Sequence, residues 1–244
     1  VYAIAPPIEM AAATEADLAA VRQKARIEPG QRLIGIAARL ATEKGVEYLV
    51  QALPLVLEKH PTARVLFVGP YQNIVGEEAY ARRLAPLFAA LGEHWTFLGV
   101  LANGEFAAFF QLCEVTVLPS TNPTESYGMV QVESMACGSP VVASDRPGVR
   151  VPVQVTGMGK LVRPGDANDL ARALVEVLDN PAGYRGAPQS LLLASTSQAV
   201  AAEYEKLFSS QRHGSLQKEP NGPVSGDSPA ASPELSRSAE TEAE

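Results

Sequence analysis

Short apolar runs alternate with helical patterns along most of this chain of 244 residues. Residues 33–38, 64–69 and 115–118 form runs in which apolar side chains follow one another, as in strands that are buried on both faces. Helical spacing of apolar residues follows these runs, for example over residues 46–57 and 77–91. The alternation predicts an α/β fold with a doubly wound, Rossmann-like parallel sheet that is covered by helices on both faces.

The same alternation continues toward the C-terminus. Further strands are predicted at residues 96–98, 141–143 and 160–162. Further helices are predicted at residues 15–24, 105–112, 128–136, 166–178 (with Asp166 as N-cap) and 197–208. In sheets of this kind, ligands bind beside the carboxyl ends of the strands. Those ends fall at Arg39, Gly69, Gly99, Ser120 and Ser144.

Composition changes sharply near residue 209. Residues 209–244 are rich in Ser, Pro, Gly and Glu and contain almost no large apolar residues, so they cannot bury enough surface to offset the entropy of ordering. We expect this C-terminal tail to be disordered. The chain begins with Val1 and a short apolar run before Pro6 and Pro7, and we expect it to be a piece of a longer protein.

The charge and cysteine content limit the partners and the compartment. The formal net charge of −7 and the lack of Lys/Arg clusters disfavour nucleic-acid binding. Cys113 and Cys137 are isolated, so we expect reduced thiols and a cytoplasmic location, although a disulfide remains an alternative. No apolar run has the length of a membrane span, and no signal peptide is recognisable.

Two glutamates, Glu125 and Glu133, lie eight positions apart around the start of a predicted helix. Gly128 lets a ligand approach the backbone there, and the free amides of the first helical turn attract anions. Glu125 can accept hydrogen bonds from sugar hydroxyls, and Glu133 can accept them from a ribose. The alternative is a helix cap at Glu125 and a surface residue at Glu133. The flanking Gly128, Gly138 and Pro140 favour a nucleotide-sugar site.

Two cations, Arg39 and Lys44, follow the first strand of the regular pattern. Together they suit a diphosphate, whose negative charge increases when a glycosidic bond breaks. The alternative is a pair of exposed side chains that form weak surface ion pairs with Glu43 and similar groups. A third location is the end of the strand at residues 96–100, where a nucleobase could lie against the backbone, or where Trp95 and Phe97 simply belong to the core.

Several common motifs are absent from the sequence. It contains neither a G-x-G-x-x-G fingerprint after a strand nor a P-loop, which disfavours those nucleotide-binding classes. It has no Asp-x-Asp pair, so no metal site is predicted. His60, His94 and His213 are scattered, and no Ser/His/Asp grouping can be assembled from them.

Several short segments of the chain resemble the C-terminal, donor-binding half of a glycosyltransferase family 4 (group 1) enzyme of GT-B architecture. They occur in the same order as in that family. The resemblance spans roughly three-quarters of the chain and rests on an ordered set of segments: residues 38–40, 44–45, 97–99, 117–120, 125–133, 136–144 and 159–166. It implies a GT-B half-domain that takes part in transfer from a nucleotide sugar with retention of anomeric configuration. It implies no cofactor, with a UDP- or GDP-linked sugar as the donor substrate.

The resemblance also implies a role for each matching residue. Arg39, Lys44 and Glu125 are the candidate catalytic residues, with Arg39 and Lys44 binding the donor diphosphate and Glu125 holding sugar hydroxyls. Glu133 is the candidate ribose ligand.

Three backbone amides complete the implied donor site. Those of Tyr127, Gly128 and Met129 are expected to hold the sugar hydroxyls together with Glu125.

The resemblance divides the chain into four parts. Residues 1–30 lead in from another domain, residues 31–182 bind the nucleotide sugar, residues 183–208 return toward that domain, and residues 209–244 form the tail. The implied partner is a missing N-terminal GT-B domain that binds an unknown acceptor and through which any membrane contact would occur. One departure is residues 146–150, which lack the glutamate of the family's Gly-Gly-x-x-Glu segment.

Three hypotheses about the function are compatible with the sequence. The first is the donor-binding half of a retaining glycosyltransferase. The second is a nucleotide-sugar-binding module that is inactive without a separate acceptor-binding domain. The third is a GT-B relative with other chemistry, such as an epimerase or a phosphorylase, which the Glu125–Glu133 element disfavours.

Overall fold

The computed structural model describes residues 4–186 and 195–214. The chain divides into a compact unit, Val1–Glu205, and a second unit, Lys206–Glu244. The compact unit contains the sheet and its covering helices. The second unit is described only as far as Gly214, where it consists of the last turns of one helix.

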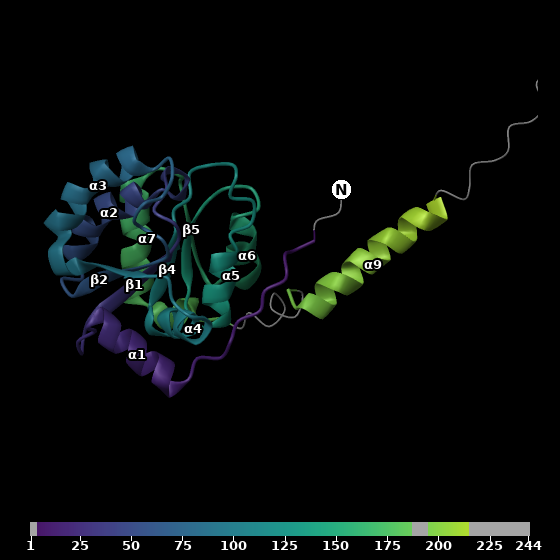
Figure 1. The fold of residues 1–244 in the computed structure, drawn as a ribbon, viewed down its shortest axis with the longest axis horizontal. Coiled ribbons are helices and arrows are strands. Elements are labelled where there is room, and N and C mark those ends of the chain that lie inside the picture. Colours follow the sequence, from purple (N-terminus) through teal and green to yellow (C-terminus); the bar gives the residue numbers. More distant parts are fainter. Residues whose placement is uncertain (1–3, 187–194, 215–244) are drawn as a thin grey trace, which may run out of the picture. The chain divides into compact units, whose positions relative to one another are not determined.

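Six parallel strands form one sheet with the order β3-β2-β1-β4-β5-β6 (Figure 1). The strands are β1 (Arg32–Ala37), β2 (Ala63–Val68), β3 (Trp95–Gly99), β4 (Val115–Leu118), β5 (Val141–Ser144) and β6 (Gly159–Val162). The predicted doubly wound parallel sheet is therefore confirmed. Each predicted strand between residues 31 and 162 is present, within two residues of its expected bounds.

The helices largely follow the predicted pattern. They are α1 (Glu15–Ala25), α2 (Val46–Leu57), α3 (Glu78–Leu91), α4 (Asn103–Leu112), α5 (Met129–Ala136), α6 (Arg150–Thr156), α7 (Ala167–Asp179) and α9 (Ser197–Gly214). Short 3-10 turns occur at Thr42–Lys44, Gly92–His94 and Pro181–Tyr184. Asp166 caps α7 as predicted, because its carboxylate accepts a hydrogen bond from the Asp169 amide at 2.9 Å.

Helix α6 was not predicted from the sequence. This helix has only seven residues, and valines at positions 151, 153 and 155 alternate as they do in a strand. Pro152 lies in its first turn, where the missing N–H has no intrahelical partner to lose. Burial of Pro152 and Val153 against the core overrides the weak helical propensity of the valines.

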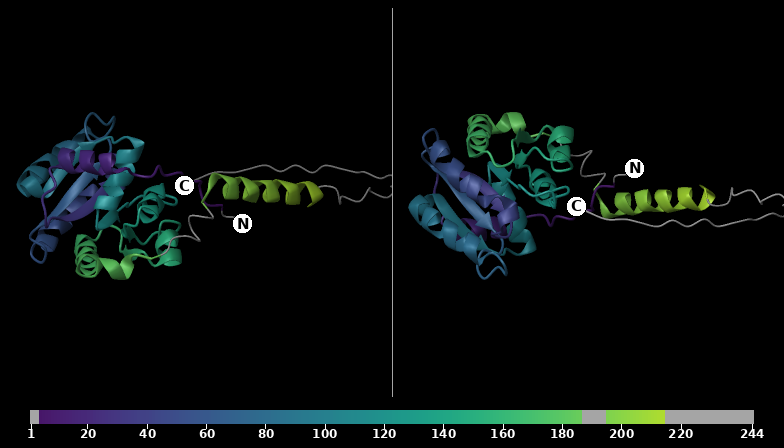
Figure 2. Two further views of the ribbon diagram at one scale, coloured as in Figure 1. Left: turned by 90° about the horizontal axis from the view of Figure 1, so that it is seen from below. Right: turned by 90° about the horizontal axis from the view of Figure 1, so that it is seen from above.

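The two faces of the sheet carry different helices, as Figure 2 shows from two sides. Ile34 and Ile36 of β1 are buried in the cluster that contains α2, α3 and α7. Leu33 and Ala37 point the other way, into the cluster that contains α1 and α4. Helices α5 and α6 cover the same face as α1 and α4, beside β4 and β5. Burial on both faces explains why the strands are continuously apolar.

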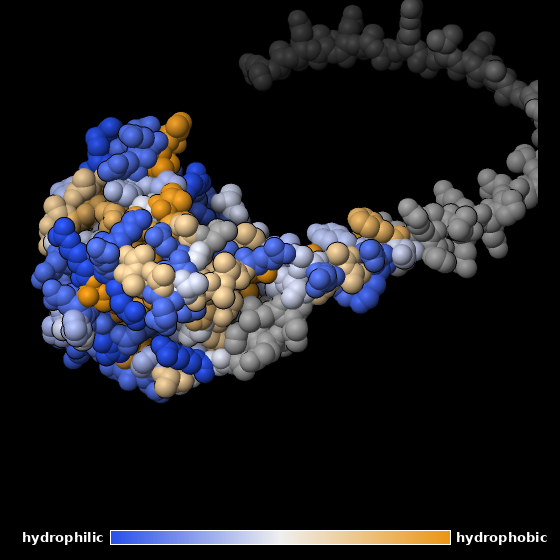
Figure 3. Space-filling view, turned by 60° about the horizontal axis from the view of Figure 1, so that its bottom comes forward, coloured by the Kyte–Doolittle hydropathy of each residue, from blue (hydrophilic) through white to orange (hydrophobic). Residues whose placement is uncertain are grey.

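The surface shown in Figure 3 mixes hydrophilic residues with smaller hydrophobic patches. Helix α9 continues to Gly214, past the expected start of the tail at residue 209. The rest of the predicted tail, residues 215–244, lies outside the described residues.

Strand order creates a switch point between β1 and β4. The chain moves from β1 to β2 and β3 on one side, and from β4 to β5 and β6 on the other. The loops that follow β1 and β4 therefore leave the sheet side by side, in the place where open α/β sheets bind ligands.

Gly45 joins these two loops through a close backbone approach. Its φ is +64°, and a Cβ atom at this position would lie 2.1 Å from the Pro119 carbonyl oxygen. A side chain is therefore excluded both by backbone conformation and by space.

We predict that Gly45→Ala lowers the free energy of unfolding by about 2 kcal/mol or more, because it adds an overlap with Pro119 to the strain of a left-handed alanine. Gly30→Ala is the matched control, since Gly30 also has a positive φ (+84°) but open space around its Cβ position. Its loss should be roughly 1 kcal/mol. Urea denaturation of both variants measures the difference, and equal losses would contradict the close approach.

Candidate functional site

The site lies where two loops meet at the carboxyl edge of the sheet. We call residues 38–45, after β1, the first loop. Residues 119–128, after β4, are called the donor loop, because the resemblance implies that they contact a sugar donor. The Thr121 amide donates a hydrogen bond to the Glu43 carbonyl at 3.1 Å. This bond and the approach of Gly45 to Pro119 hold the two loops together through their backbones.

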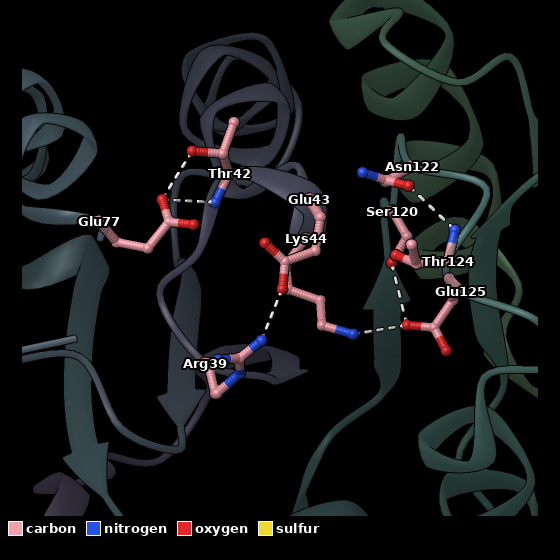
Figure 4. Close-up of polar contacts among 9 residues, drawn as sticks. All are labelled: Arg39, Thr42, Glu43, Lys44, Glu77, Ser120, Asn122, Thr124 and Glu125. Carbon is pink, nitrogen blue, oxygen red and sulfur yellow. Dashed lines mark hydrogen bonds and ion pairs between the residues drawn. The ribbon is translucent and has the colours of Figure 1, made fainter. Parts of the chain in front are cut away.

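An ion pair crosses from the first loop to the donor loop (Figure 4). Lys44 Nζ lies 2.6 Å from Glu125 Oε2, and the two side chains are only 26% and 17% exposed. The Ser120 hydroxyl donates to the same carboxylate oxygen at 3.4 Å. Lys44 and Glu125, which are 81 residues apart in sequence, are thus brought into direct contact.

Arg39 is more exposed and has a different partner. Its guanidinium lies 2.8 Å from the Glu43 carboxylate, and its side chain is 58% exposed. Figure 4 shows Arg39 below Lys44 on the first loop, with the Glu43 carboxylate above its guanidinium. Both predicted cations therefore lie on one loop, and each already contacts a glutamate.

Glu77 supports the first loop from the neighbouring segment. Its carboxylate accepts hydrogen bonds from the Thr42 amide at 3.0 Å and from the Thr42 hydroxyl at 2.6 Å. The contact between Glu77 and Thr42 was not predicted from the sequence. Residues 42 and 77 follow different strands, and only the pairing of β1 with β2 brings them together.

Helix α5 begins at the donor loop. Gly128 has φ +75°, so the helix starts at Met129, one residue later than predicted. No side chain in the described part of the chain caps this first turn. Its backbone amides therefore leave a partial positive charge at the end of the donor loop. Tyr127 is half-buried, which raises the pKa of its phenol, whereas Met129 is 47% exposed.

Glu133 lies on α5, about one turn beyond Val130. Burial raises the pKa of its carboxyl group above the ordinary value. Cys137 lies one further turn along, and its pKa is raised to about 11, by burial first and then by the charge of Glu133. The spacing of Val130, Glu133 and Cys137 places them on one stripe of the helix.

An apolar cavity of about 290 Å³ opens at the carboxyl ends of β1, β2 and β3. Its lining residues are Ala37, Ala38, Val68, Gly69, Pro70, Val100, Leu101, Phe106 and Val130. Val100 lies at the strand end that was proposed above as a place for a nucleobase. Phe106 and Val130 were missed, because their helical patterns alone gave no reason to place them at this edge. Val130 connects the cavity to the Glu133 stripe of α5.

Cys113 is buried and Cys137 half-buried, and both are free thiols, as expected. Within residues 4–186 and 195–214, no cluster of three or more His, Cys, Asp or Glu side chains is arranged to hold a metal. Among these same residues, no helix is both long and apolar enough to cross a membrane.

The sequence model of the family described as "Glycosyl transferases group 1" matches residues 19–189, which is more than half of the chain. The chain belongs to this family. Its group 1 relatives include the D-inositol 3-phosphate glycosyltransferase of Pseudarthrobacter chlorophenolicus, which is 31% identical over 182 residues. That alignment covers 73% of this chain and 42% of the relative.

Solved structures of similar proteins support the same assignment. Sucrose-phosphate synthase from Thermosynechococcus elongatus matches with a TM-score of 0.68 and 28% identity, over 84% of this chain and 52% of that chain. Anabaena HepE, solved in complex with UDP-glucose, matches with a TM-score of 0.61 and 26% identity, over 84% and 54%. The present group 1 chain thus has the fold of a GT-B half-domain and spans about half the length of these proteins.

The raised pKa of Glu133 predicts a pH-dependent cost to stability. Since folding favours the protonated form, the contribution of Glu133 to stability is most favourable below the ordinary glutamate pKa and is lost as pH rises through the raised value. Glu133→Gln should therefore increase the free energy of unfolding at pH 7, and this gain should vanish as pH falls below the ordinary pKa.

Urea denaturation at several pH values measures this effect. Glu205→Gln is the matched control, because it removes the same charge from an exposed position away from both ends of α9, and it should unfold as the wild type does. A Glu133→Gln variant that is less stable than the wild type at pH 7 would mean that the Glu133 carboxylate is stabilised by a partner.

Proposed function

We propose that this chain is the donor-binding, C-terminal half of a retaining glycosyltransferase of family 4, which moves a sugar from a nucleotide sugar to an acceptor. One observation carries the proposal. Lys44 contacts Glu125 at the switch point of the sheet, and the loop that carries Glu125 leads into the uncapped start of α5. The cation can pair with the diphosphate of a nucleotide sugar. The carboxylate and the free amides can form hydrogen bonds with its sugar hydroxyls.

Arg39 and Lys44 are proposed to bind the donor diphosphate. Each cation contacts a glutamate, and these contacts offer the negative charge that a diphosphate would supply. Binding then exchanges carboxylate oxygens for phosphate oxygens around the same two cations. Because the leaving diphosphate gains charge as the glycosidic bond breaks, the cations stabilise it more strongly in the transition state than in the ground state.

Glu125 and the amides of Tyr127, Gly128 and Met129 are proposed to hold the sugar. When the diphosphate draws Lys44 away, the Glu125 carboxylate becomes available to accept hydrogen bonds from sugar hydroxyls. Glu125 and Lys44 would thus act on adjacent parts of one donor.

The apolar cavity and Glu133 are proposed to hold the nucleoside. The base would lie in the cavity at the strand ends, and the Glu133 carboxylate would accept hydrogen bonds from the ribose hydroxyls. HepE, a relative by structure, has been solved with UDP-glucose. This supports a UDP-linked donor, with a GDP-linked donor as the alternative.

The acceptor and the partner domain belong to the same proposal. Residues 1–30 would lead in from an N-terminal, acceptor-binding domain, and residues 183–208 would return toward it. A second candidate function is a nucleotide-sugar-binding module that is inactive without that domain. The binding module is favoured because the residues proposed to contact the donor all belong to this chain, at the carboxyl edge of its sheet.

Titration calorimetry with UDP, GDP and ADP tests the donor site. We expect selective binding of one nucleotide, weakened about tenfold or more by Glu133→Ala, because the ribose loses a charged acceptor. If a folded wild-type chain binds none of the three, the donor-binding function proposed for this chain is wrong. Binding that Glu133→Ala leaves unchanged would remove Glu133 from the site.

Lys44→Met and Arg39→Met should each weaken binding of the selected nucleotide about tenfold, with a smaller effect at high salt, because each removes one cation from the diphosphate. Lys59→Met, at an exposed position after α2, is the matched control and should bind as the wild type does. Wild-type affinity in both loop variants would refute their assignment.

The two candidate functions differ in turnover. Release of the nucleotide from its sugar, with water as acceptor, should be measurable for a transferase half and should be lost in Lys44→Met. Donor binding without any release would instead favour the binding module.

A further inference from the structure

Gln131 is an amide side chain in the first turns of α5 that is fully buried beside the donor loop. Its Nε2 atom donates one hydrogen bond to the Tyr127 carbonyl at 2.6 Å and another to the Val149 carbonyl at 2.8 Å. Tyr127 belongs to the donor loop, whereas Val149 lies just before α6, after β5. One side chain thus connects two separate backbone segments.

The orientation of this amide follows from its partners. Both neighbours are carbonyl oxygens, which only accept hydrogen bonds, so the NH₂ group must face them. The Oε1 atom is buried and meets no donor among the described residues. A buried, unpaired oxygen is unfavourable. A leucine would fill a similar volume without that cost, but it would donate nothing to the two carbonyls.

The segment after β5, residues 145–149, contacts the donor loop at two further points. The Arg146 guanidinium donates to the Thr121 carbonyl at 2.7 Å. Gly148 has φ +81°, and a Cβ atom there would lie 1.9 Å from the Ser126 carbonyl oxygen. We call residues 145–149 the bracing segment. It contacts the donor loop near its start and near its end, and Gln131 joins the two at the end.

These contacts surround the part of the donor loop that carries Glu125. Lys44, which follows β1, contacts Glu125 of the donor loop from one side. The bracing segment follows β5, and it contacts the donor loop from the opposite side. Strand β4 lies between β1 and β5 in the sheet. By contrast, none of the residues that line the apolar cavity belongs to the bracing segment.

We propose that Gln131 is a positioning residue that fixes the donor loop against the bracing segment, so that Glu125 and the first amides of α5 face the donor sugar. This inference rests on the proposed function. It makes recognition of the sugar depend on Gln131, whereas recognition of the nucleoside depends on the cavity and on Glu133.

Titration calorimetry of Gln131→Leu with UDP and UDP-glucose tests the inference. The dissociation constant for UDP-glucose should rise about tenfold, whereas that for UDP should change less than about twofold. A general loss of structure would weaken both ligands together, so the ratio of the two constants separates positioning from folding. Gln154→Leu makes the same change at an exposed position of α6 and should leave both constants unchanged.

Amide hydrogen exchange without ligand gives a second measurement. In Gln131→Leu, exchange should become about tenfold faster in both residues 121–128 and residues 145–149, with the strands unchanged. If Gln131→Leu does not fold, Arg146→Met removes the other side-chain contact between the two segments from a half-buried position. It should lower the preference for UDP-glucose over UDP in the same way.

Unchanged exchange in both segments would overturn the inference, whatever the ligand. It would also be overturned if wild type bound both ligands and the variants changed them equally or not at all. If wild type bound neither UDP nor UDP-glucose, a UDP-linked donor would be wrong, and faster exchange in the variants would still establish the contact between the two segments.

Discussion

The parallel pairing of β1 with β4 is the constraint on which the site depends. Ile34 pairs with Val115 and Gly35 with Thr116, so the two strands run together and end at the same edge. Their loops then touch through Gly45 and Pro119, with no room for a side chain. Because the backbones of the two loops are held close together, Lys44 and Glu125 can form an ion pair with 2.6 Å between Nζ and Oε2.

Each of the two cations at this edge is paired with a carboxylate of the chain itself. Lys44 and Arg39 each contact a glutamate, and Glu77 holds the first loop through Thr42. Glu133, in contrast, is half-buried, and no ion pair with another residue of the described ranges offsets the burial that raises its pKa. Such a carboxylate costs stability, and proteins commonly retain a cost of this kind where a ligand needs the group. The combination fits a site that is prepared for a charged ligand with several hydroxyls.

Much of the fold could be predicted because burial leaves a direct record in the sequence. Strands covered on both faces are continuously apolar, and Asp166 marks the start of α7 in a way that local chemistry alone explains. Lys44, Glu125 and Glu133 could be proposed because they stand near strand ends or a helix start. Helix α6 could not, because its valines alternate like a strand and only packing against the core makes it helical.

The sequence by itself determined the order along the chain of the strands and of the helices other than α6, the polar residues at the strand ends and the resemblance to group 1 glycosyltransferases. Only the tertiary structure decided which of these residues meet. The contacts of Lys44 with Glu125, of Thr42 with Glu77 and of Gln131 with Val149 join segments that follow different strands. Their distances depend on the order of strands in the sheet, and local sequence patterns, which record burial and backbone preference, carry no direct information about that order.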